Sequence, residues 1–399
     1  MSTDQQTGDL PGGTRSGPYA SAVRWMENLS ETQYAYLLLT PALLLLGVVA
    51  FWPLLSTFRL SLFADSFGQA SVGNFVALGN YVDIITGERT ALLPSPFLPQ
   101  ALTVNALFNS AIAVTIVFTV ISVSIETIIG FAQALILDKD FRGRRWVRVA
   151  IILPWAIPIV VQGMIFYLMF QPNIGFLVGT PEAPALLNSL GLLSFTPLAN
   201  AQDATMIVIV ADVWKTTAFM ALLILAGMQS IDRSLFDVAK VAGASPWQRF
   251  KYITLPIILP TVMVAMLFRT IQAMRIYGLI ETVAGCTVVP SLSCLVVTTF
   301  NNRMLGSSAT VAFITAAVIG AVVSVYLDGY ERGNRAYRAI HGRTAACGAN
   351  RSTRAARYSG GSRSRSRSRS APTARCSTSR RSSFSRRRCS RSTSCSCWE

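Results

Sequence analysis

The chain has 399 residues, of which 52% are hydrophobic and 14% are charged, and its formal net charge is +16. A positive mean hydropathy over this length excludes an ordinary soluble globular protein and favours a membrane protein. The single histidine, His341, lies beyond the last apolar run, which excludes histidine triads, metal sites and proton relays within the membrane; no G-x-x-x-x-G-K-[ST] sequence is present to form a P-loop.

Six apolar runs are long enough to cross a bilayer. The 33 residues before the first run are polar and lack a signal-peptide pattern, so we expect a cytoplasmic N-terminal segment (1–33) followed by an uncleaved first span. In chain order, the runs cover residues 34–58, 108–137, 146–170, 204–228, 256–284 and 309–327. They predict an all-α membrane domain of about six transmembrane helices over residues 34–330.

Basic residues are concentrated in two of the connections between the runs. Cytoplasmic connections of membrane proteins are enriched in Lys and Arg, so these two connections and both termini are predicted to face the cytoplasm of a cell-membrane protein. The other three connections, around residues 59–105, 171–203 and 285–308, are predicted to face outward. The basic residues that carry this prediction are Lys139, Arg142, Arg144, Arg145, Arg148, Arg233, Lys240, Arg249 and Lys251.

Ionisable side chains within the second and fourth runs are expected to avoid lipid, because charge in hydrocarbon is unfavourable. Glu126 and Gln133 are seven residues apart on one helix face, where structural hydrogen bonding is the expected role. Asp212 and Lys215 are spaced i, i+3 and can neutralise each other, with Trp214 beside them.

A polar segment over residues 231–256 separates the fourth and fifth runs and predicts a docking surface. Gly243 suits the left-handed position after a short helix over 234–242. Ser245 can cap a second short helix, with Pro246 at its first position and Gln248 completing a capping box. Small residues let a partner approach closely, and Trp247 and Phe250 supply apolar anchors. The alternative is an ordinary helical connection.

The fifth run carries Arg269, Gln272 and Arg275 at every third position, and this face is expected to line a polar cavity or a subunit contact. A hydroxyl-rich ligand needs hydrogen-bonding side chains and a flat apolar surface. The alternative is that these polar groups only bond neighbouring helices. The candidates for the substrate pathway are Trp214, Gln272, Arg275 and Tyr277.

Cys286 and Cys294 lie in the predicted outward connection after the fifth run, where a disulfide is permitted. Two unpaired, semi-apolar loop cysteines are nevertheless the favoured interpretation of this pair.

The composition changes abruptly near Arg343. Residues 343–399 carry 15 of the 35 basic residues, all of them arginine, and five of the seven cysteines. We favour the interpretation that this segment results from a GC-rich coding sequence translated in a shifted frame. The alternative is an arginine–serine segment that binds nucleic acid or anionic lipid. In both cases residues 331–399 are predicted to be a disordered tail.

The polar segment resembles the "EAA loop" of permease subunits in ATP-driven, binding-protein-dependent importers. The family pattern is E-A-A-x-x-x-G, followed after nine intervening residues by I-x-L-P. This chain has Asp237-Val-Ala, Gly243 and Ile253-Thr-Leu-Pro at the same spacing. It departs in Asp237 for Glu and Val238 for Ala. The resemblance implies that the segment docks an ATPase through Asp237, Ala239, Gly243, Ala244, Trp247, Phe250, Leu255 and Pro256.

Other segments resemble carbohydrate permeases similar to the larger membrane subunit of the maltose system: 78–81, 106–110, 212–231 and 268–278. Gly278 stands where that family has an acidic residue, and Ala284-Gly-Cys where it has a Gly-Gly-Pro-like turn, so the identity of the sugar is open. The resemblance implies a type I ABC importer permease fold with cytoplasmic coupling helices.

In function, the resemblance implies a non-catalytic subunit that moves a sugar by alternating access. Its partners would be a second permease, two ABC ATPase subunits, an external solute-binding protein and the lipid bilayer. The chain itself would hold no cofactor, and ATP–Mg would bind to the ATPase subunits. Alternatives are a permease for a polyol or glycerol phosphate, a free-standing channel or secondary carrier, and a membrane-tethered nucleic-acid binder based on the tail, the least favoured of these.

Overall fold

The computed structural model describes residues 29–66, 73–90 and 92–359, with side chains up to residue 332. The chain divides into two compact units, Met1–Tyr337 and Arg338–Glu399, and the fold described below is that of the first unit. Helices make up its regular structure, and an isolated bridge between Phe63 and Phe75 is the one β-type pairing in the described part.

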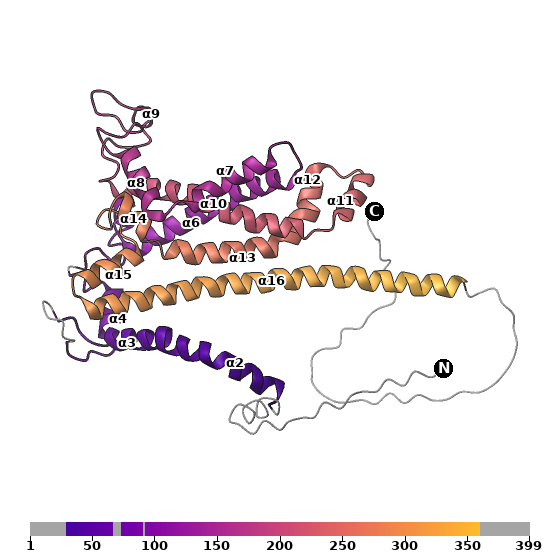
Figure 1. Ribbon diagram of the computed structural model, residues 1–399, viewed down its shortest axis with the longest axis horizontal. Coiled ribbons are helices and arrows are strands. Elements are labelled where there is room, and N and C mark those ends of the chain that lie inside the picture. The colour runs from indigo at the N-terminus through magenta and orange to yellow at the C-terminus, as the bar shows by residue number, and fades with distance from the viewer. Residues whose placement is uncertain (1–28, 67–72, 91, 360–399) are drawn as a thin grey trace, which may run out of the picture. The chain divides into compact units, whose positions relative to one another are not determined.

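The helices follow one another along the chain as shown in Figure 1. Their bounds are α2 (Glu31–Leu46), η1 (Gly47–Phe51), α3 (Trp52–Ser61), α4 (Gly79–Thr86), α5 (Val104–Phe108), α6 (Ala111–Asp138), α7 (Arg144–Ala156), α8 (Ile159–Phe170), α9 (Leu186–Ser189), α10 (Ala201–Gln229), α11 (Arg233–Val241), α12 (Pro246–Arg249), η2 (Phe250–Thr254), α13 (Leu255–Met274), α14 (Gly278–Val283), α15 (Leu292–Asn301) and α16 (Leu305–Ser359).

Five helical stretches within the described residues are long and apolar enough to cross a membrane: Glu31–Ser61, Ala111–Asp138, Ala201–Gln229, Pro246–Met274 and Leu305–Arg332. The pair α7 and α8 passes the same test only as a bent span, with 92° between its halves. Counted in this way, the predicted number of about six spans is confirmed, and the protein is a multi-pass membrane protein.

The prediction of an unbroken third span over 146–170 is wrong. The helix stops at Ala156 and restarts at Ile159, with Ile157 in an extended conformation. Pro158 explains the break, because its ring disfavours a helical conformation for the residue before it.

The predicted limits of the fifth span are also wrong at both ends. The helix starts at Pro246, ten residues before the predicted start, and α13 ends at Met274, ten residues before the predicted end. Arg275, Ile276 and Tyr277 then separate α13 from the short helix α14. Apolar residues such as Ile276, Leu279 and Ile280 resume directly after Arg275, so a hydropathy average continues past the break and could not locate it.

The core is built on α10, which packs mainly against α6 and α13. Phe118 on α6, Met220 and Ile224 on α10 and Ile258 on α13 are almost completely buried. Gly130 permits the close approach of α6 to α10, because a Cβ there would lie 2.8 Å from the Cβ of Met220. Three adjacent spans thus form one packed unit.

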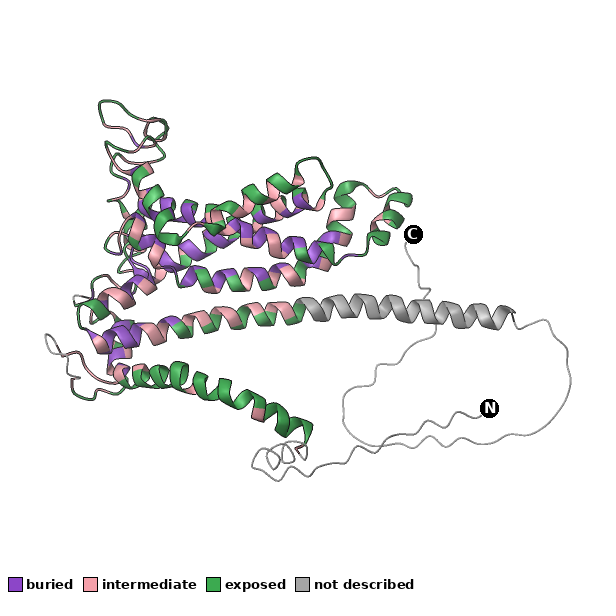
Figure 2. Cartoon of the chain, viewed as in Figure 1, coloured by how far each residue is buried: buried purple, intermediate pink, exposed green. Residues whose placement is uncertain are grey.

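The first span is mostly exposed, as Figure 2 shows for α2, η1 and α3, and its one buried residue is Ser61 at the end of α3. Its C-terminal end is held by side chains of α4. The side chain of Asn80 on α4 donates to the carbonyls of Ser61 (2.8 Å) and Phe63 (2.7 Å), and the Tyr81 hydroxyl lies 2.7 Å from the Ser61 hydroxyl. These contacts give a structural role to the matched segment 78–81.

The helix α16 continues to Ser359, so the prediction of a disordered tail from residue 331 is wrong for 331–359. The many alanines and arginines of this stretch are strong helix formers, which accounts for the continued helix. The arginine–serine run that follows lies outside the described residues.

Candidate functional site

The polar segment forms a protruding loop with a helix on each side of Gly243. The helix α11 begins one residue before the predicted start, because Asp232 caps it by accepting a hydrogen bond from the Ser234 N–H at 2.9 Å. Hydrogen bonds from the backbone and hydroxyl of Ser234 lower the pKa of the exposed Asp232 carboxyl. Gly243 has φ +80°, which confirms the predicted left-handed turn.

The second side of the loop begins with the predicted capping box. The Ser245 N–H donates to Gln248 Oε1 at 2.8 Å, and the Gln248 N–H donates to Ser245 Oγ at 3.3 Å. This is not a separate short helix, however. The helix α12 continues through the π-helical turn η2 into α13, so the second half of the loop and the fifth span form one continuous helix, Pro246–Met274.

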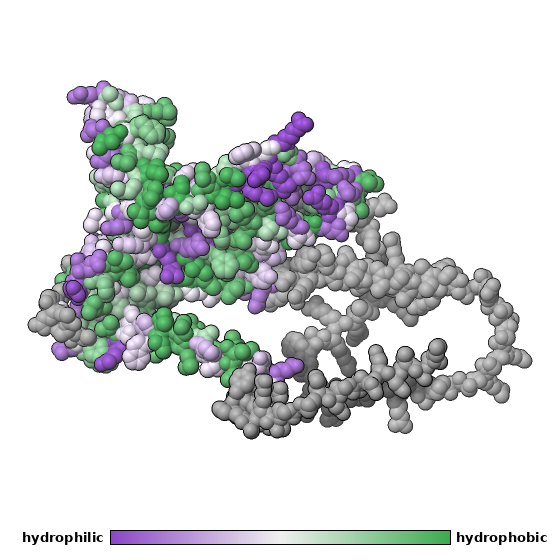
Figure 3. All heavy atoms as spheres, viewed as in Figure 1, coloured by the Kyte–Doolittle hydropathy of each residue, from purple (hydrophilic) through white to green (hydrophobic). Residues whose placement is uncertain are grey.

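Large apolar side chains on this loop are exposed. The exposed fractions are 69% for Val238, 90% for Val241 and 68% for Trp247. Between them, Asp237 forms an exposed ion pair with Lys240 at 2.9 Å. Figure 3 shows hydrophilic residues gathered at this end of the bundle, around α11 and α12. An apolar surface with a charged surround is the kind of surface that binds another protein.

The loop is connected to the core by aromatic contacts. The Phe250 ring lies 5.4 Å from the Trp247 ring in a stacked geometry and 5.4 Å edge-to-face from Phe131 of α6. Phe131 and Phe236 pack in turn against a buried cluster that includes Ile224. Phe250 is therefore an internal contact rather than a free anchor, and a movement of the loop would be passed to α6 and α10.

The other predicted loop residues differ in exposure. Asp237 and Gly243 are exposed, whereas Ala239 and Ala244 are half-buried. Leu255 and Pro256 are exposed but lie in the first turn of α13.

Deep in the unit, a cluster of charged side chains joins the three core spans. Arg269 on α13 forms two hydrogen bonds with Glu126 on α6, from Nε to Oε2 at 2.5 Å and from Nη2 to Oε1 at 2.9 Å, and a third contact with Asp212 on α10. Ser122 lies 2.7 Å from both carboxylates, and Thr216 donates to Glu126 at 2.8 Å. Glu126 is fully buried and accepts these bonds, so its predicted structural role is confirmed. The same role is not borne out for Gln133, because its buried Oε1 has no hydrogen-bond partner among the described residues.

This cluster corrects two predictions. Asp212 pairs with Arg269 and not with Lys215. Arg269 is 2% exposed and does not share a pathway face with Gln272 and Arg275. Successive residues of an α-helix turn by about 100°, so a spacing of three shifts each residue by about 60° around the helix, and Arg275 lies beyond the helix end.

Lys215 stabilises the bend between α7 and α8. Its ammonium group donates to the carbonyl of Ile157, which the break leaves without a helical partner. Next to it, the fully buried Gln162 of α8 donates to the carbonyl of Ala211 at 2.5 Å. The Ile157-Pro158 sequence could have predicted the break between α7 and α8. Nothing in the sequence indicated that Lys215 of α10 would bind the carbonyl that the break leaves free.

Three of the four pathway candidates, Gln272, Arg275 and Tyr277, lie at the break after α13. Gln272 and Arg275 are exposed, and Tyr277 packs against the core. Arg275 lines a groove of about 550 Å³ together with Ser293 on α15 and Thr315 on α16. Trp214 is 42% exposed and packs against Phe166 of α8, with 5.9 Å between ring centroids.

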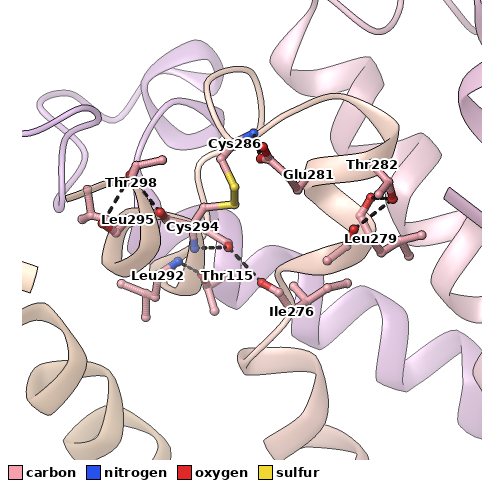
Figure 4. Close-up of a disulfide and its surroundings, with 12 residues drawn as sticks. Thr115, Ile276, Leu279, Glu281, Thr282, Cys286, Leu292, Cys294, Leu295 and Thr298 are labelled. Atoms are coloured by element: carbon pink, nitrogen blue, oxygen red, sulfur yellow. Dashed lines mark hydrogen bonds between the residues drawn. A yellow bond between two sulfur atoms is a disulfide. The ribbon is translucent and has the colours of Figure 1, made fainter. Parts of the chain in front are cut away.

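The favoured interpretation of two unpaired cysteines is wrong, because a disulfide joins Cys286 and Cys294 (Figure 4). It closes the loop between α14 and α15. The Cys286 N–H donates to Glu281 at 3.0 Å, and the Ser291 hydroxyl donates to the carbonyl of Ile276 at 3.0 Å. The Leu292 N–H donates to Thr115 of α6 at 2.9 Å, so this loop ties the break after α13 to a core span.

Comparison with known proteins identifies the family. The profile of the family described as "Binding-protein-dependent transport system inner membrane component" matches residues 126–335, which include the charged cluster, the loop and the break.

Similar proteins include the "Trehalose/maltose transport system permease protein MalF" of Thermococcus litoralis, which is 32% identical over 301 residues, covering 74% of this chain and 93% of that protein. The "Trehalose transport system permease protein SugA" of Mycobacterium tuberculosis is 32% identical over 64% of this chain and 75% of its own length.

Among solved structures, a chain of "a bacterial ABC transporter involved in the import of the acidic polysaccharide alginate" superimposes with a TM-score of 0.56. The likeness covers 77% of this chain and 99% of that chain at 19% identity, and it shows the type I importer permease fold. The chain therefore belongs to the family of binding-protein-dependent transport system inner membrane components.

Proposed function

We propose that this protein is the membrane-spanning subunit of an ATP-driven importer for a sugar. The observation that carries the proposal is the exposed apolar loop surface joined by Phe250 to α6 and by a continuous helix to α13. Such a connection can pass movement from a docked ATPase to the packed spans. Sugar is the favoured solute because the trehalose and maltose permeases are similar over most of the chain.

The docked partner is an ABC ATPase. The loop contributes Asp237, Gly243 and Trp247 to the contact, and Ala239 and Ala244 allow the surfaces to approach closely. In this arrangement the loop end of the bundle and both chain termini face the cytoplasm, in agreement with the concentration of Lys and Arg there. This chain is not an enzyme and holds no cofactor; ATP–Mg is bound and hydrolysed by two ATPase subunits.

The solute moves by alternating access between this chain and a second permease subunit, after delivery by an external solute-binding protein. Gln272, Arg275 and Tyr277 lie at the break after α13, where backbone leaves the regular helix and polar side chains can meet a solute. Trp214 offers an apolar ring from α10. The deeper charged groups of the core spans, Glu126, Asp212, Lys215 and Arg269, are used in contacts within the chain.

Uptake of radiolabelled trehalose and maltose tests the proposal. A strain lacking this gene should lose uptake of one of them and recover it when the gene is restored. A strain that takes up both sugars normally, but loses uptake of a polyol or glycerol phosphate, would favour the second candidate, a permease for another polar solute. Unchanged uptake of all four would contradict an importer function.

A further inference from the structure

A polar pocket that none of the pathway candidates lines is formed by α5, the start of α10 and the disulfide loop. It has a volume of about 330 Å³, within the range of roughly 300–1,000 Å³ typical of small-molecule sites. Its lining includes four carboxamide side chains and one hydroxyl, those of Asn105, Asn109, Asn200, Gln202 and Thr287, and no charged residue.

The carboxamides present both donors and acceptors to the pocket. Asn200 uses its Oδ1 to cap α10, accepting from the backbone N–H groups of Gln202 (2.9 Å) and Asp203 (3.3 Å), so its NH₂ group remains a donor. Asn109 uses its NH₂ group on the carbonyl of Asn105 at 2.8 Å, so its Oδ1 remains an acceptor. All four carboxamide residues are exposed, and a solute can reach them.

The walls of the pocket are held in place by contacts of their own. The cap fixes Asn200, and Phe108, which also lines the pocket, is 9% exposed. Thr287 and Val288 directly follow Cys286, whose disulfide and hydrogen bond to Glu281 hold this side of the pocket. A site with fixed walls loses little conformational freedom when a ligand binds.

We propose that this pocket binds a neutral, hydroxyl-rich solute, such as one ring of the transported sugar, before the solute enters the pathway. Each sugar hydroxyl can donate and accept, which matches carboxamides that do both. A lining without charge favours a neutral ring over a phosphate or a carboxylate. The inference rests on the proposed function for the identity of the sugar, but the pocket itself is argued from its lining.

Direct binding of trehalose tests the pocket. The permease complex, without its solute-binding protein, is placed in lipid nanodiscs, so that no maltoside detergent competes, and titrated with trehalose by saturation-transfer NMR. We expect saturable binding that weakens about fivefold or more in Asn200→Asp and in Gln202→Leu, as expected for losing a hydrogen bond to a ligand. Asn200→Asp keeps the oxygen that caps α10 but replaces the NH₂ donor with a charged carboxylate oxygen, and Gln202→Leu removes a carboxamide without adding charge.

The matched control is Asn301→Ala, which removes an exposed carboxamide from the end of α15, outside this pocket. It should leave binding unchanged. Absence of saturable binding, or equal binding in all variants, would overturn the inference. So would variants that bind trehalose normally but bind the solute-binding protein less well, because the pocket would then be a protein contact.

The uptake assay keeps the two claims separate. If the strain imports trehalose and yet the pocket variants bind it as the wild type does, the pocket inference fails and the importer stands. If the strain imports none of the tested solutes, the proposed function fails, and trehalose binding is still judged by the titration.

Discussion

The guanidinium group of Arg269 lies 2.5 Å from Glu126, although the two residues are 143 positions apart in the sequence. Both side chains are almost completely buried, and Asp212 binds the same guanidinium from a third span. Removing either member of a buried ion pair leaves the other charge buried without a partner, which strongly destabilises the fold. The pair therefore fixes how α6, α10 and α13 pack.

Replacing Arg269 by methionine should destabilise the protein strongly. Two buried carboxylates would lose their cation, which typically costs about 3–5 kcal/mol. The measurement is the midpoint of thermal unfolding of the purified complex in nanodiscs. Arg275→Met is the matched control: Arg275 is exposed, and the midpoint should stay near that of the wild type. Equal midpoints for both variants would contradict the structural role of the cluster.

Exposed Arg275 and Gln272 should matter for transport rather than for assembly. Arg275→Ala and Gln272→Ala are expected to reduce sugar uptake severalfold while the complex still co-purifies, because their side chains make no contact that holds the described core. Arg275→Lys should retain part of the activity if the charge is what contributes. Normal uptake in both alanine variants, or loss of assembly in both, would show that this pathway assignment is wrong.

Removal of the disulfide should loosen the loop between α14 and α15. The cross-link closes a loop of about nine residues, for which the chain-entropy relation gives roughly 2–3 kcal/mol. Cys286→Ser combined with Cys294→Ser should lower the unfolding midpoint, and a reductant should do the same to the wild type but not to the double variant. A reductant effect of equal size in both proteins would contradict this prediction.

Local motifs allowed the loop to be predicted from the sequence. Gly243, Ser245 and Gln248 each act on neighbours within a few positions, so their turn and cap could be assigned without knowing the fold. The family resemblance supplied the docking role, which remains a prediction. The continuity of this helix with α13 was missed because Arg249 and Lys251 interrupt the apolar run, so that hydropathy places the start of the span only at Pro256.

Long-range pairing could not be predicted in the same way. Asp212 has Lys215 nearby in sequence, and only the packing of α13 against α10 decides that Arg269 is its partner instead. Likewise, Lys215 finds a free carbonyl at Ile157 because the bend at Pro158 creates one. The choice among partners depends on three-dimensional proximity, which hydropathy and spacing do not contain.

The docking loop is the part of the molecule on which the proposed mechanism depends most. Gly243→Asp should strain the left-handed turn, by about 1 kcal/mol or more, and place a charge on the contact surface. Gly191→Asp is the matched control, because Gly191 also has a left-handed backbone, with φ +68°, and also has open space around its α-carbon, but it lies in the connection between α9 and α10. Asp237→Lys reverses a charge at the contact without backbone strain.

Co-purification of the ABC ATPase with each variant, measured together with ATP-dependent sugar uptake in vesicles, tests the central claim most directly. Gly243→Asp and Asp237→Lys should lose most of the bound ATPase and of the uptake while still inserting in the membrane at wild-type levels, and Gly191→Asp should keep both. Wild-type ATPase binding and uptake in Gly243→Asp and Asp237→Lys would contradict the claim that this loop couples the chain to ATP hydrolysis.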